Sequence, residues 1–503
     1  MRKIFQRIFA VVPAVLLQFA WMFLLLRWLA PYAAVLNFIL TLLALLYVLY
    51  IISSRHESTY KILWLLAILA FPITGTILYL CFGNRKTLRP IRKRLEKGRA
   101  TLTEATMATD VREELEEINC RVARTFCYVQ ELTGLPVMRC ENAEYYPLGE
   151  LAWQEMLESL KAAKRFIFVE YFIVEPGLMW DSMVEIMSEK AEQGVDVRVM
   201  YDDLGSISTY TKENVLQLRR KGIQCMAFNP LLFVTGTANY RDHRKMLIID
   251  GNVAFSGGIN LADEYINHVE KYGHWKDIGF RLTGAPVQNY TRMFAEFWNA
   301  FSDNPIAVNQ FTGTTEASHL IGDGYVLSYY DSPIYPEPVS NNLYIELLTL
   351  ATDTAWFFTP YLMLGDTLLD AFVRAARRGV DVRIIMPGIP DKALIYRMSR
   401  SYYSVLLQAG VKIYEYTPGF VHAKGCIIDD EIGTIGTVNL DYRSLFLHFE
   451  NNSLFYKASL LADMKQDFLR TQQKCRERTM ENIGHSFRKW LVDGVLQIFA
   501  PLC

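Results

Sequence analysis

The 503-residue sequence has no excess of charge of either sign. It contains 52 Lys and Arg residues against 53 Asp and Glu residues, which gives a formal net charge of −1. Proteins that hold a polyanion generally carry a surplus of basic residues. The balance therefore speaks against a nucleic-acid partner, and we expect none.

The sequence also lacks paired cysteines. Its eight Cys residues form no Cys-x-x-Cys pair and no cluster with His at ligand-like spacing. These patterns are the usual sequence signs of a structural zinc or a redox couple. We interpret the cysteines as reduced thiols on the cytosolic side of a membrane and expect no structural zinc.

Charged residues are missing from three long apolar runs near the N-terminus, at residues 8–26, 33–53 and 62–82. Each run has about 20 residues, which as a helix would span a hydrocarbon core of roughly 30 Å. The first run is too long for a cleaved signal peptide, and two more runs follow it. Residues 1–83 are therefore predicted to form a multi-pass membrane anchor.

A basic cluster at residues 85–99, with Glu96 as its single acid, follows the last apolar run and places the body of the protein in the cytoplasm. Arg2, Lys3 and Arg7 favour a cytoplasmic N-terminus as well. Three full crossings cannot satisfy both signals. Either one run is re-entrant, with Pro72 as a candidate break, or the basic residues at the N-terminus, which are the weaker signal, do not set the topology. The cluster is equally consistent with binding anionic lipid headgroups.

The most informative positive feature is a motif that occurs twice with identical internal spacing. A single His-x-Lys carries little information, but two complete matches would arise by chance in far fewer than roughly one chain in a thousand. Imidazole, ammonium and amide groups together suit phosphate chemistry. The two copies are His243, Lys245, Asp250, Gly257 and Asn260, and His422, Lys424, Asp429, Gly436 and Asn439.

Strands and helices alternate in the same order around each copy. Residues 165–174 and 194–200 read as strands on either side of a helix at 180–193, and the order returns at 355–362, 367–378 and 379–385. This alternation favours a mostly parallel, covered sheet in each half. We divide the remaining chain into a helix-rich connector (84–130), a first half (131–312), a second half (313–483) and an amphipathic C-terminal segment (484–503).

The paired motif resembles that of the phospholipase D superfamily, and the chain from about residue 33 onward is similar to bacterial cardiolipin synthases of that superfamily. Thr437 stands where Ser is usual, and the first apolar run is an addition. The resemblance implies two α/β/α halves that form one pseudo-two-fold catalytic body behind transmembrane helices. The stretches that carry it are 60–64, 71–75, 239–245, 257–261 and 436–445.

Transfer of a phosphodiester needs a nucleophile, a proton donor for the leaving alcohol and positive charge on the phosphoryl oxygens. One motif histidine would attack phosphorus while the other acts as acid and then base. Lys245 and Lys424 would supply charge, with Asn260 and Asn439 as neutral donors, so that no metal or cofactor is required. The resemblance makes His243 the nucleophile and His422 the acid/base, although the residues themselves are symmetric.

Each catalytic histidine should have a carboxylate partner that fixes its tautomer. Asp250 and Asp429 belong to the motif, but a strand separates them from their histidines, and a structural role is favoured over a catalytic one. The resemblance points instead to Asp277 and Glu450, downstream of each motif. The remaining histidines, 448 among them, are interpreted as surface or packing residues.

Two apolar segments are each consistent with two interpretations. The aromatic residues of 228–233 and Tyr240 line either a lipid entrance or the core. Residues 490–502 form either a helix that lies on the bilayer or a packing helix.

The leading functional hypothesis is lipid transphosphatidylation: one phosphatidylglycerol gives its phosphatidyl group to histidine, and a second phosphatidylglycerol accepts it, giving cardiolipin and glycerol. The alternatives are hydrolysis by a phospholipase or nuclease, transfer to another alcohol, and a scaffold with an inactive site. The expected location is the bacterial plasma membrane, with the catalytic body on the cytoplasmic side. The sequence leaves the oligomeric state open.

Overall fold

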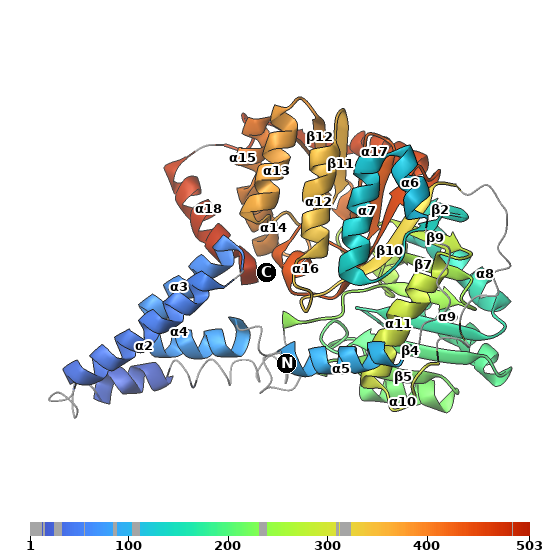
Figure 1. Ribbon diagram of the computed structural model, residues 1–503, viewed down its shortest axis with the longest axis horizontal. Coiled ribbons are helices and arrows are strands. Elements are labelled where there is room, and N and C mark those ends of the chain that lie inside the picture. The colour runs from blue at the N-terminus through green and yellow to red at the C-terminus, as the bar shows by residue number, and fades with distance from the viewer. Residues whose placement is uncertain are drawn as a thin grey trace.

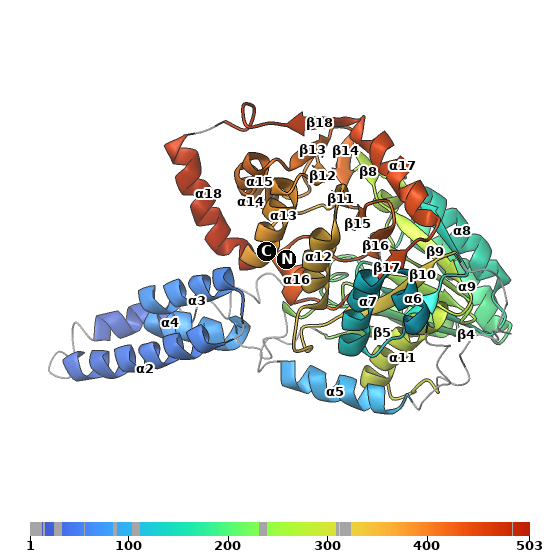
Figure 2. The same ribbon diagram turned by 45° about the horizontal axis from the view of Figure 1, so that its top comes forward.

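The computed structural model describes residues 13, 16–24, 33–54, 56–83, 88–102, 111–230, 239–307, 311, 323–484 and 486–502. Its body contains two mixed β-sheets, one in each half of the chain, with helices packed on their faces (Figure 1). A group of helices from the N-terminal region projects away from this body (Figure 2).

The first-half sheet has seven strands in the order β2-β9-β7-β6-β3-β4-β5. Strands β3, β4 and β5 are parallel, whereas the other neighbouring pairs are antiparallel. In sheet order the strands are β2 (Asn142–Tyr146), β9 (Gly279–Thr283), β7 (Val253–Gly257), β6 (Met246–Ile249), β3 (Phe166–Tyr171), β4 (Asp196–Asp202) and β5 (Gln224–Phe228).

The second-half sheet repeats this order and adds one strand at each edge. Strands β11, β12 and β13 are its parallel part. In sheet order it contains β1 (Met138–Arg139), β10 (Tyr325–Asp331), β17 (Glu450–Tyr456), β16 (Ile432–Gly436), β15 (Gly425–Ile428), β11 (Thr354–Phe358), β12 (Asp381–Pro387), β13 (Lys412–Tyr416) and β18 (Cys475–Arg478).

Two expectations about these sheets need correction. The sheets are mixed rather than mostly parallel, because the motif strands β6 and β15 each turn directly into an antiparallel neighbour, and a tight turn permits only that pairing. In addition, β1 lies within the stretch assigned to the first half, yet it pairs with β10 of the second-half sheet.

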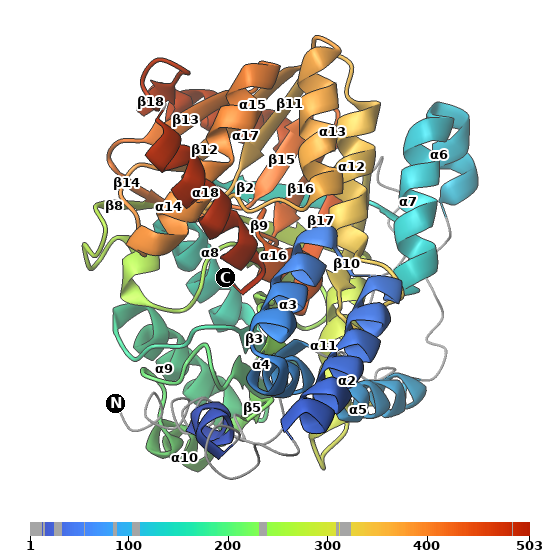
Figure 3. The ribbon, with the colours of Figure 1, turned by 90° about the vertical axis from the view of Figure 1, so that its left-hand side faces the viewer.

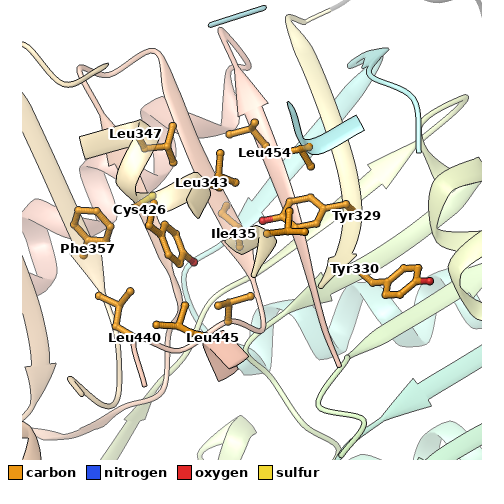
Figure 4. Packing of buried hydrophobic residues seen from close by; sticks show 14 of the residues in the cluster. Tyr329, Tyr330, Leu343, Leu347, Phe357, Cys426, Ile435, Leu440, Leu445 and Leu454 are labelled. Carbon is orange, nitrogen blue, oxygen red and sulfur yellow. The ribbon is translucent and has the colours of Figure 1, made fainter. Parts of the chain in front are cut away.

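Helices cover both sheets. Leu343 and Leu347 of α12 lie against the sheet face that carries Phe357, Ile435 and Leu454 (Figure 4). The predicted helices at 180–193 and 367–378 are present as α9 and α13. The helices of the body are α8 (Gly149–Ala162), α9 (Leu178–Glu192), α10 (Lys212–Arg220), α11 (Val287–Phe301), α12 (Val339–Leu350), α13 (Asp366–Arg377), α14 (Ala393–Ser401), α15 (Tyr403–Ala409), α16 (Tyr442–Phe446) and α17 (Leu460–Gln472).

The connector consists of three helices that pack on the body: α5 (Arg89–Ala100), α6 (Arg112–Ile118) and α7 (Cys120–Thr133). Helix α5 crosses α11 and packs against its C-terminal part (Figure 1). Two basic residues of the cluster bind the body directly: Arg92 donates to the Ile334 carbonyl oxygen at 2.6 Å, and Arg99 donates to the Tyr330 hydroxyl at 2.6 Å. Part of the cluster therefore has a structural role that the sequence did not indicate.

The third apolar run is not one continuous helix. It divides into α3 (Ser58–Ala70), α4 (Pro72–Leu78) and a π-helical turn (Tyr79–Gly83), with the break at Phe71. Helix α4 folds back on α3, and a Cβ at Gly75 would lie 2.3 Å from the Ala67 carbonyl oxygen. This result corrects the expectation of an unbroken span and agrees with a break at Pro72.

The second run forms α2 (Ala33–Ser53), and most of the first run, at residues 8–26, lies outside the described residues. Among the described residues, no helix combines the length and the apolar character that a membrane crossing requires.

The C-terminal segment forms α18 (Phe487–Phe499) and a short 3-10 turn (Ala500–Leu502). Helix α18 packs on α14 and on α3, and Figure 3 shows α18 and α3 on the same face of the molecule. Its Phe487 and Trp490 side chains are 77% and 69% exposed. The helix thus contacts the body on one side and presents aromatic side chains to the outside on the other.

Candidate active site

The two motif histidines sit at equivalent places, in the segments that lead into β6 and β15. The backbone N–H of His243 donates to the Phe449 carbonyl oxygen at 2.8 Å, and that of His422 donates to the Lys276 carbonyl oxygen at 2.7 Å. Each motif segment is thus held by the opposite half of the chain, so that the two motifs face each other across the junction of the halves.

The histidine–carboxylate pairs are exchanged between the halves. His243 Nδ1 lies 2.8 Å from Glu450 Oε2, and His422 Nδ1 lies 2.7 Å from Asp277 Oδ2. Both acids are fully buried. The two acids predicted to orient the imidazoles do contact them, but each serves the histidine of the other motif. In this geometry the Nε2 atom of each ring is the one left for chemistry.

Both motif lysines are buried next to these pairs. Lys245 Nζ donates to the His243 carbonyl oxygen at 2.7 Å, and Lys424 Nζ donates to that of His422. Burial is the main cause that lowers the pKa of Lys245 to about 8 and that of Lys424 to about 7, although nearby carboxylates oppose it. An anionic group that entered the site would favour the charged form of both.

The two motif asparagines differ in their contacts. Asn260 Oδ1 accepts from the Ile173 backbone N–H at 3.1 Å, and its Nδ2 donates to the Tyr265 hydroxyl at 2.7 Å. Asn439 is buried, and its Oδ1 has no hydrogen-bond partner among the described residues. Both side chains line the cavity described below.

Asp250 and Asp429 lie apart from the paired imidazoles and lysines, and their contacts are those of the structural role that was favoured for them. Asp250 accepts backbone N–H bonds from residues 164, 165 and 166 at 2.7–2.9 Å, and Asp429 accepts from residues 352, 353 and 354 at 2.7–2.8 Å. A four-residue strand, about 13 Å long, separates each of them from its lysine. Their function is to bind the chain where β3 and β11 begin.

A cavity of about 580 Å³ opens between the halves and exposes both imidazoles. Its wall near His422 is aromatic, with Tyr265, Trp275 and Phe420 packed around that ring. Near His243 the lining is Phe172, Arg443 and His448. The cavity therefore combines a phosphate-sized polar centre with surfaces that suit apolar groups.

The titration of the two half-sites is unequal. Burial, reinforced by the nearby lysines, lowers the pKa of His243 well below its usual value and that of His422 to about 4. Burial raises the pKa of Glu450. Burial also acts to raise the pKa of Asp277, but His422 and Lys424 outweigh it and the net pKa is lowered. Asp277 is therefore more readily ionised than Glu450.

Buried ion pairs anchor the first motif segment from behind. Arg241 Nε binds both Asp202 carboxylate oxygens at 3.0 Å, and Arg244 Nε binds Asp242 Oδ1 at 3.0 Å. Arg244 also binds Glu170 of β3. The sequence analysis did not identify these residues. They hold the motif segment against the ends of the central strands.

His448, which was interpreted from the sequence as a surface or packing residue, also lies in the site. Its ring lies 5.6 Å from that of His243 between centroids, and it lines the cavity. Its position two residues before Glu450 was the available signal. By contrast, Phe228 and Tyr240 are core residues rather than a lipid entrance, and residues 231–233 lie outside the described residues.

One group of metal-ligand-type side chains occurs among the described residues: His243, His448 and Glu450, whose ligand atoms lie within 4.8 Å of one another. Lys245 lies beside this group and influences the pKa of all three. A buried ammonium group at that position opposes a divalent cation. The donor set therefore fits an anionic ligand better than a metal ion.

Comparison with known proteins gives consistent results. The family model described as a PLD-like domain of cardiolipin synthase matches residues 156–298 and 344–472, once in each half. A model described as the N-terminal region of phospholipase D-nuclease matches residues 39–84.

Full-length relatives agree with these matches. The chain is 33% identical to a cardiolipin synthase of Alkalihalophilus pseudofirmus, over 90% of each chain. It is 40% identical to an uncharacterized protein of Streptococcus mutans, over 90% of this chain and 99% of that protein. Its fold is similar to that of a phosphatidylserine synthase of Haemophilus influenzae, with a TM-score of 0.54, 16% identity, and coverage of 75% of this chain and 98% of that chain.

Proposed function

This chain belongs to the PLD-like cardiolipin synthase family, and from that premise we propose that it transfers a phosphatidyl group between two phosphatidylglycerol molecules through a phosphohistidine. It is a phosphatidyltransferase of the cardiolipin synthase type. The observation that carries the proposed mechanism is that His243 and His422, each paired with a buried carboxylate, line one cavity, and that a buried lysine contacts the backbone of each histidine.

The first half-reaction forms the covalent intermediate. His243 Nε2 attacks phosphorus, and the bond from phosphorus to the glycerol headgroup oxygen breaks. During this step the Nδ1–H of His243 stays hydrogen-bonded to Glu450. His422 Nε2 gives its proton to the headgroup oxygen, so that glycerol leaves as a neutral alcohol. Burial lowers the pKa of His422 to about 4, and the negative charge of a bound phosphodiester would raise that pKa and favour the protonated ring that this step requires.

The second half-reaction reverses these roles with a different alcohol. The headgroup hydroxyl of a second phosphatidylglycerol gives its proton to His422 and attacks phosphorus, and the bond to His243 breaks. One phosphodiester replaces another, so no nucleotide is consumed. Lys245 and Lys424 act in both steps by neutralising charge on the phosphoryl oxygens, and Asn260 and Asn439 hold neighbouring positions of the cavity wall.

A lipid substrate requires that the cavity lie close to a bilayer, and residues 1–83 are proposed to hold it there as a multi-pass anchor. Two contacts support this arrangement. The Tyr60 ring of α3 stacks on Tyr442 of α16 at 5.6 Å, and the Phe82 carbonyl oxygen accepts from Asn239 Nδ2 at 2.9 Å, just before the first motif. The apolar segment thus adjoins both motifs.

The exposed side chains of α2 fit an apolar surrounding, since Phe38 is 69% exposed and Val35 is 62% exposed. The proposed location is the bacterial plasma membrane, with the catalytic body on the cytoplasmic side beside the basic connector. An apolar neighbourhood also limits the access of water, which would otherwise convert the phosphohistidine to phosphatidic acid.

The test is a product analysis of the purified full chain in phosphatidylglycerol vesicles with a labelled headgroup. The proposal predicts labelled glycerol and cardiolipin in equal amounts. It also predicts a labelled phosphoenzyme after quenching in detergent at neutral to mildly alkaline pH, where a phosphohistidine is stable, when the phosphatidyl phosphorus is labelled. His243→Asn should lose both the product and the phosphoenzyme. The matched control His268→Asn, at an exposed histidine, should behave as wild type.

Three results would contradict the proposal. Phosphatidic acid as the main product would identify a hydrolase, and preference for another acceptor alcohol would identify a different transphosphatidylase. Unchanged cardiolipin formation in both His243→Asn and His422→Asn would remove the motif from the chemistry altogether.

A further inference from the structure

The two half-sites share one backbone register, which allows residues to be matched across the pseudo-two-fold axis. Asp242 bridges Phe449 in parallel, and Val421 pairs with Lys276 in the same way. Each bridge precedes a motif histidine by one residue. Phe449 therefore corresponds to Lys276, and by the same register His448 corresponds to Trp275.

His448 and Trp275 occupy matching places in the cavity. The ring centroids of His448 and His243 are 5.6 Å apart, and those of Trp275 and His422 are also 5.6 Å apart. Both side chains line the cavity. The half-site of His243 thus carries an imidazole where the other half-site carries an indole.

The hydrogen bonding around the two acids differs at the same point. Asp277 is satisfied on both oxygens, since Oδ2 contacts His422 and Oδ1 accepts from the Ile278 backbone N–H at 2.8 Å. Glu450 Oε2 contacts His243 and accepts from the Thr437 hydroxyl, and the Ser444 hydroxyl lies beside the same carboxyl group. Its buried Oε1 and both buried ring nitrogens of His448 have no hydrogen-bond partner among the described residues.

These orphaned atoms lie close to one another, with His448 Nδ1 3.7 Å from Glu450 Oε1. Buried polar groups that remain unpaired carry a substantial free-energy cost, which a small rotation of the imidazole would remove. We propose that His448 is a positioning residue of the His243 half-site, whose Nδ1–H donates to Glu450 Oε1 so that one carboxylate joins two imidazoles. This inference rests on the proposed function, because it assigns His448 to the step in which His243 attacks phosphorus.

The consequence is a fixed carboxylate plane. With Oε1 held by His448 and Oε2 held by His243 and Thr437, Glu450 cannot rotate, and the His243 ring keeps Nε2 directed into the cavity. The charged groups around this pair are Arg241, Arg443 and Lys245 on the side of His448, and Lys245 and Asp441 on the side of Glu450. Burial and these cations lower the pKa of His448, which keeps the ring neutral with one N–H to donate.

Two nearly isosteric substitutions separate a hydrogen bond from packing. His448→Leu removes the donor, whereas His448→Asn offers an amide N–H to Glu450 Oε1. We expect phosphoenzyme formation in single-turnover experiments to slow on the order of tenfold or more in His448→Leu, as for loss of a hydrogen bond to a charged group, and to recover to within about threefold of wild type in His448→Asn. The pH profile of that step should shift in the Leu variant only.

The control is His274→Leu, because His274 is only partly buried and bonds to the Tyr416 hydroxyl at 3.1 Å, outside the cavity lining. It should leave the rate and the pH profile of phosphoenzyme formation unchanged. Thermal unfolding of each variant checks that it is folded. If His448→Asn and His448→Leu are destabilised to the same thermal midpoint, a difference between their rates of phosphoenzyme formation still reports the hydrogen bond.

The inference is overturned if His448→Leu matches wild type in rate and pH profile, or if the Asn and Leu variants lose activity equally. Failure of the proposed function would look different, because wild-type enzyme itself would then form neither phosphoenzyme nor cardiolipin.

Discussion

At the scale of single residues, the main finding is that each motif histidine is oriented by an acid from the opposite half. His243 depends on Glu450, and His422 depends on Asp277. Neither half therefore contains a complete catalytic histidine unit, and the halves must dock before either imidazole is held in place.

Lys424 leads to a prediction about pH. Its pKa is lowered to about 7, chiefly by burial, so the charged form that neutralises phosphoryl oxygens is lost as the pH rises through that value. We expect kcat/KM for phosphatidylglycerol to fall above a pH of about 7. In Lys424→Arg the guanidinium stays protonated, so this limb should move upward even though the maximum rate falls with the changed geometry. Identical alkaline limbs in the two enzymes would disprove the assignment.

At the scale of elements, the turn after each motif strand binds the backbone at the start of a neighbouring strand. Asp429 adopts a φ of 49° and binds three consecutive backbone N–H groups where β11 begins. Asp429→Ala should lower the free energy of unfolding by about 1–3 kcal/mol, because three backbone N–H groups lose a charged acceptor. Asp429→Asn should cost less, since Asn keeps one oxygen and tolerates positive φ.

Denaturant unfolding of the full chain measures this difference, with the exposed Asp370→Ala on α13 as the control. The turnover per folded molecule should stay near wild type in all three variants. A large loss of turnover in folded Asp429→Asn would restore a catalytic role for the motif aspartate.

The break in the third apolar run gives a second prediction at this scale. Gly75 lies so close to α3 that an added methyl group would meet the Ala67 backbone. Gly75→Ala should therefore separate α4 from α3 and lower the thermal midpoint of the full chain. Gly494→Ala in α18 is the matched control, because nothing lies within 4 Å of the added Cβ there. Equal thermal midpoints for the two variants would show that the α3–α4 packing is unimportant.

At the scale of the whole molecule, the apolar N-terminal helices, α18 and the cavity are physically connected. The Leu502 carbonyl oxygen accepts from Arg443 at 2.9 Å, and both residues line the cavity, while α18 packs against α3. Helix α18, which carries exposed aromatic residues, lies on the same face of the molecule as α3 (Figure 3). This arrangement suits delivery of lipid from a bilayer to the catalytic centre.

The corresponding prediction compares two forms of substrate. The double variant Phe487→Glu/Trp490→Glu should turn over long-chain phosphatidylglycerol in vesicles several-fold more slowly, because charged side chains weaken interfacial binding. Turnover of a water-soluble short-chain analogue should not change. Leu216→Glu, at an exposed position on α10, is the control for an added surface charge. An equal loss with both substrates would point to damage within the body instead.

The sequence by itself determined the paired His and Lys motif, the duplication and the family, because these depend on residue identity and spacing along the chain. It also located Pro72 as a break and identified Asp277 and Glu450 as partners for imidazoles. Tertiary structure alone decided that the two acids are exchanged, that Asp250 and Asp429 are turn residues, and that His448 stands opposite Trp275. Those features arise from the docking of two halves, and contacts between segments that lie 145 to 207 residues apart leave no local pattern in the chain.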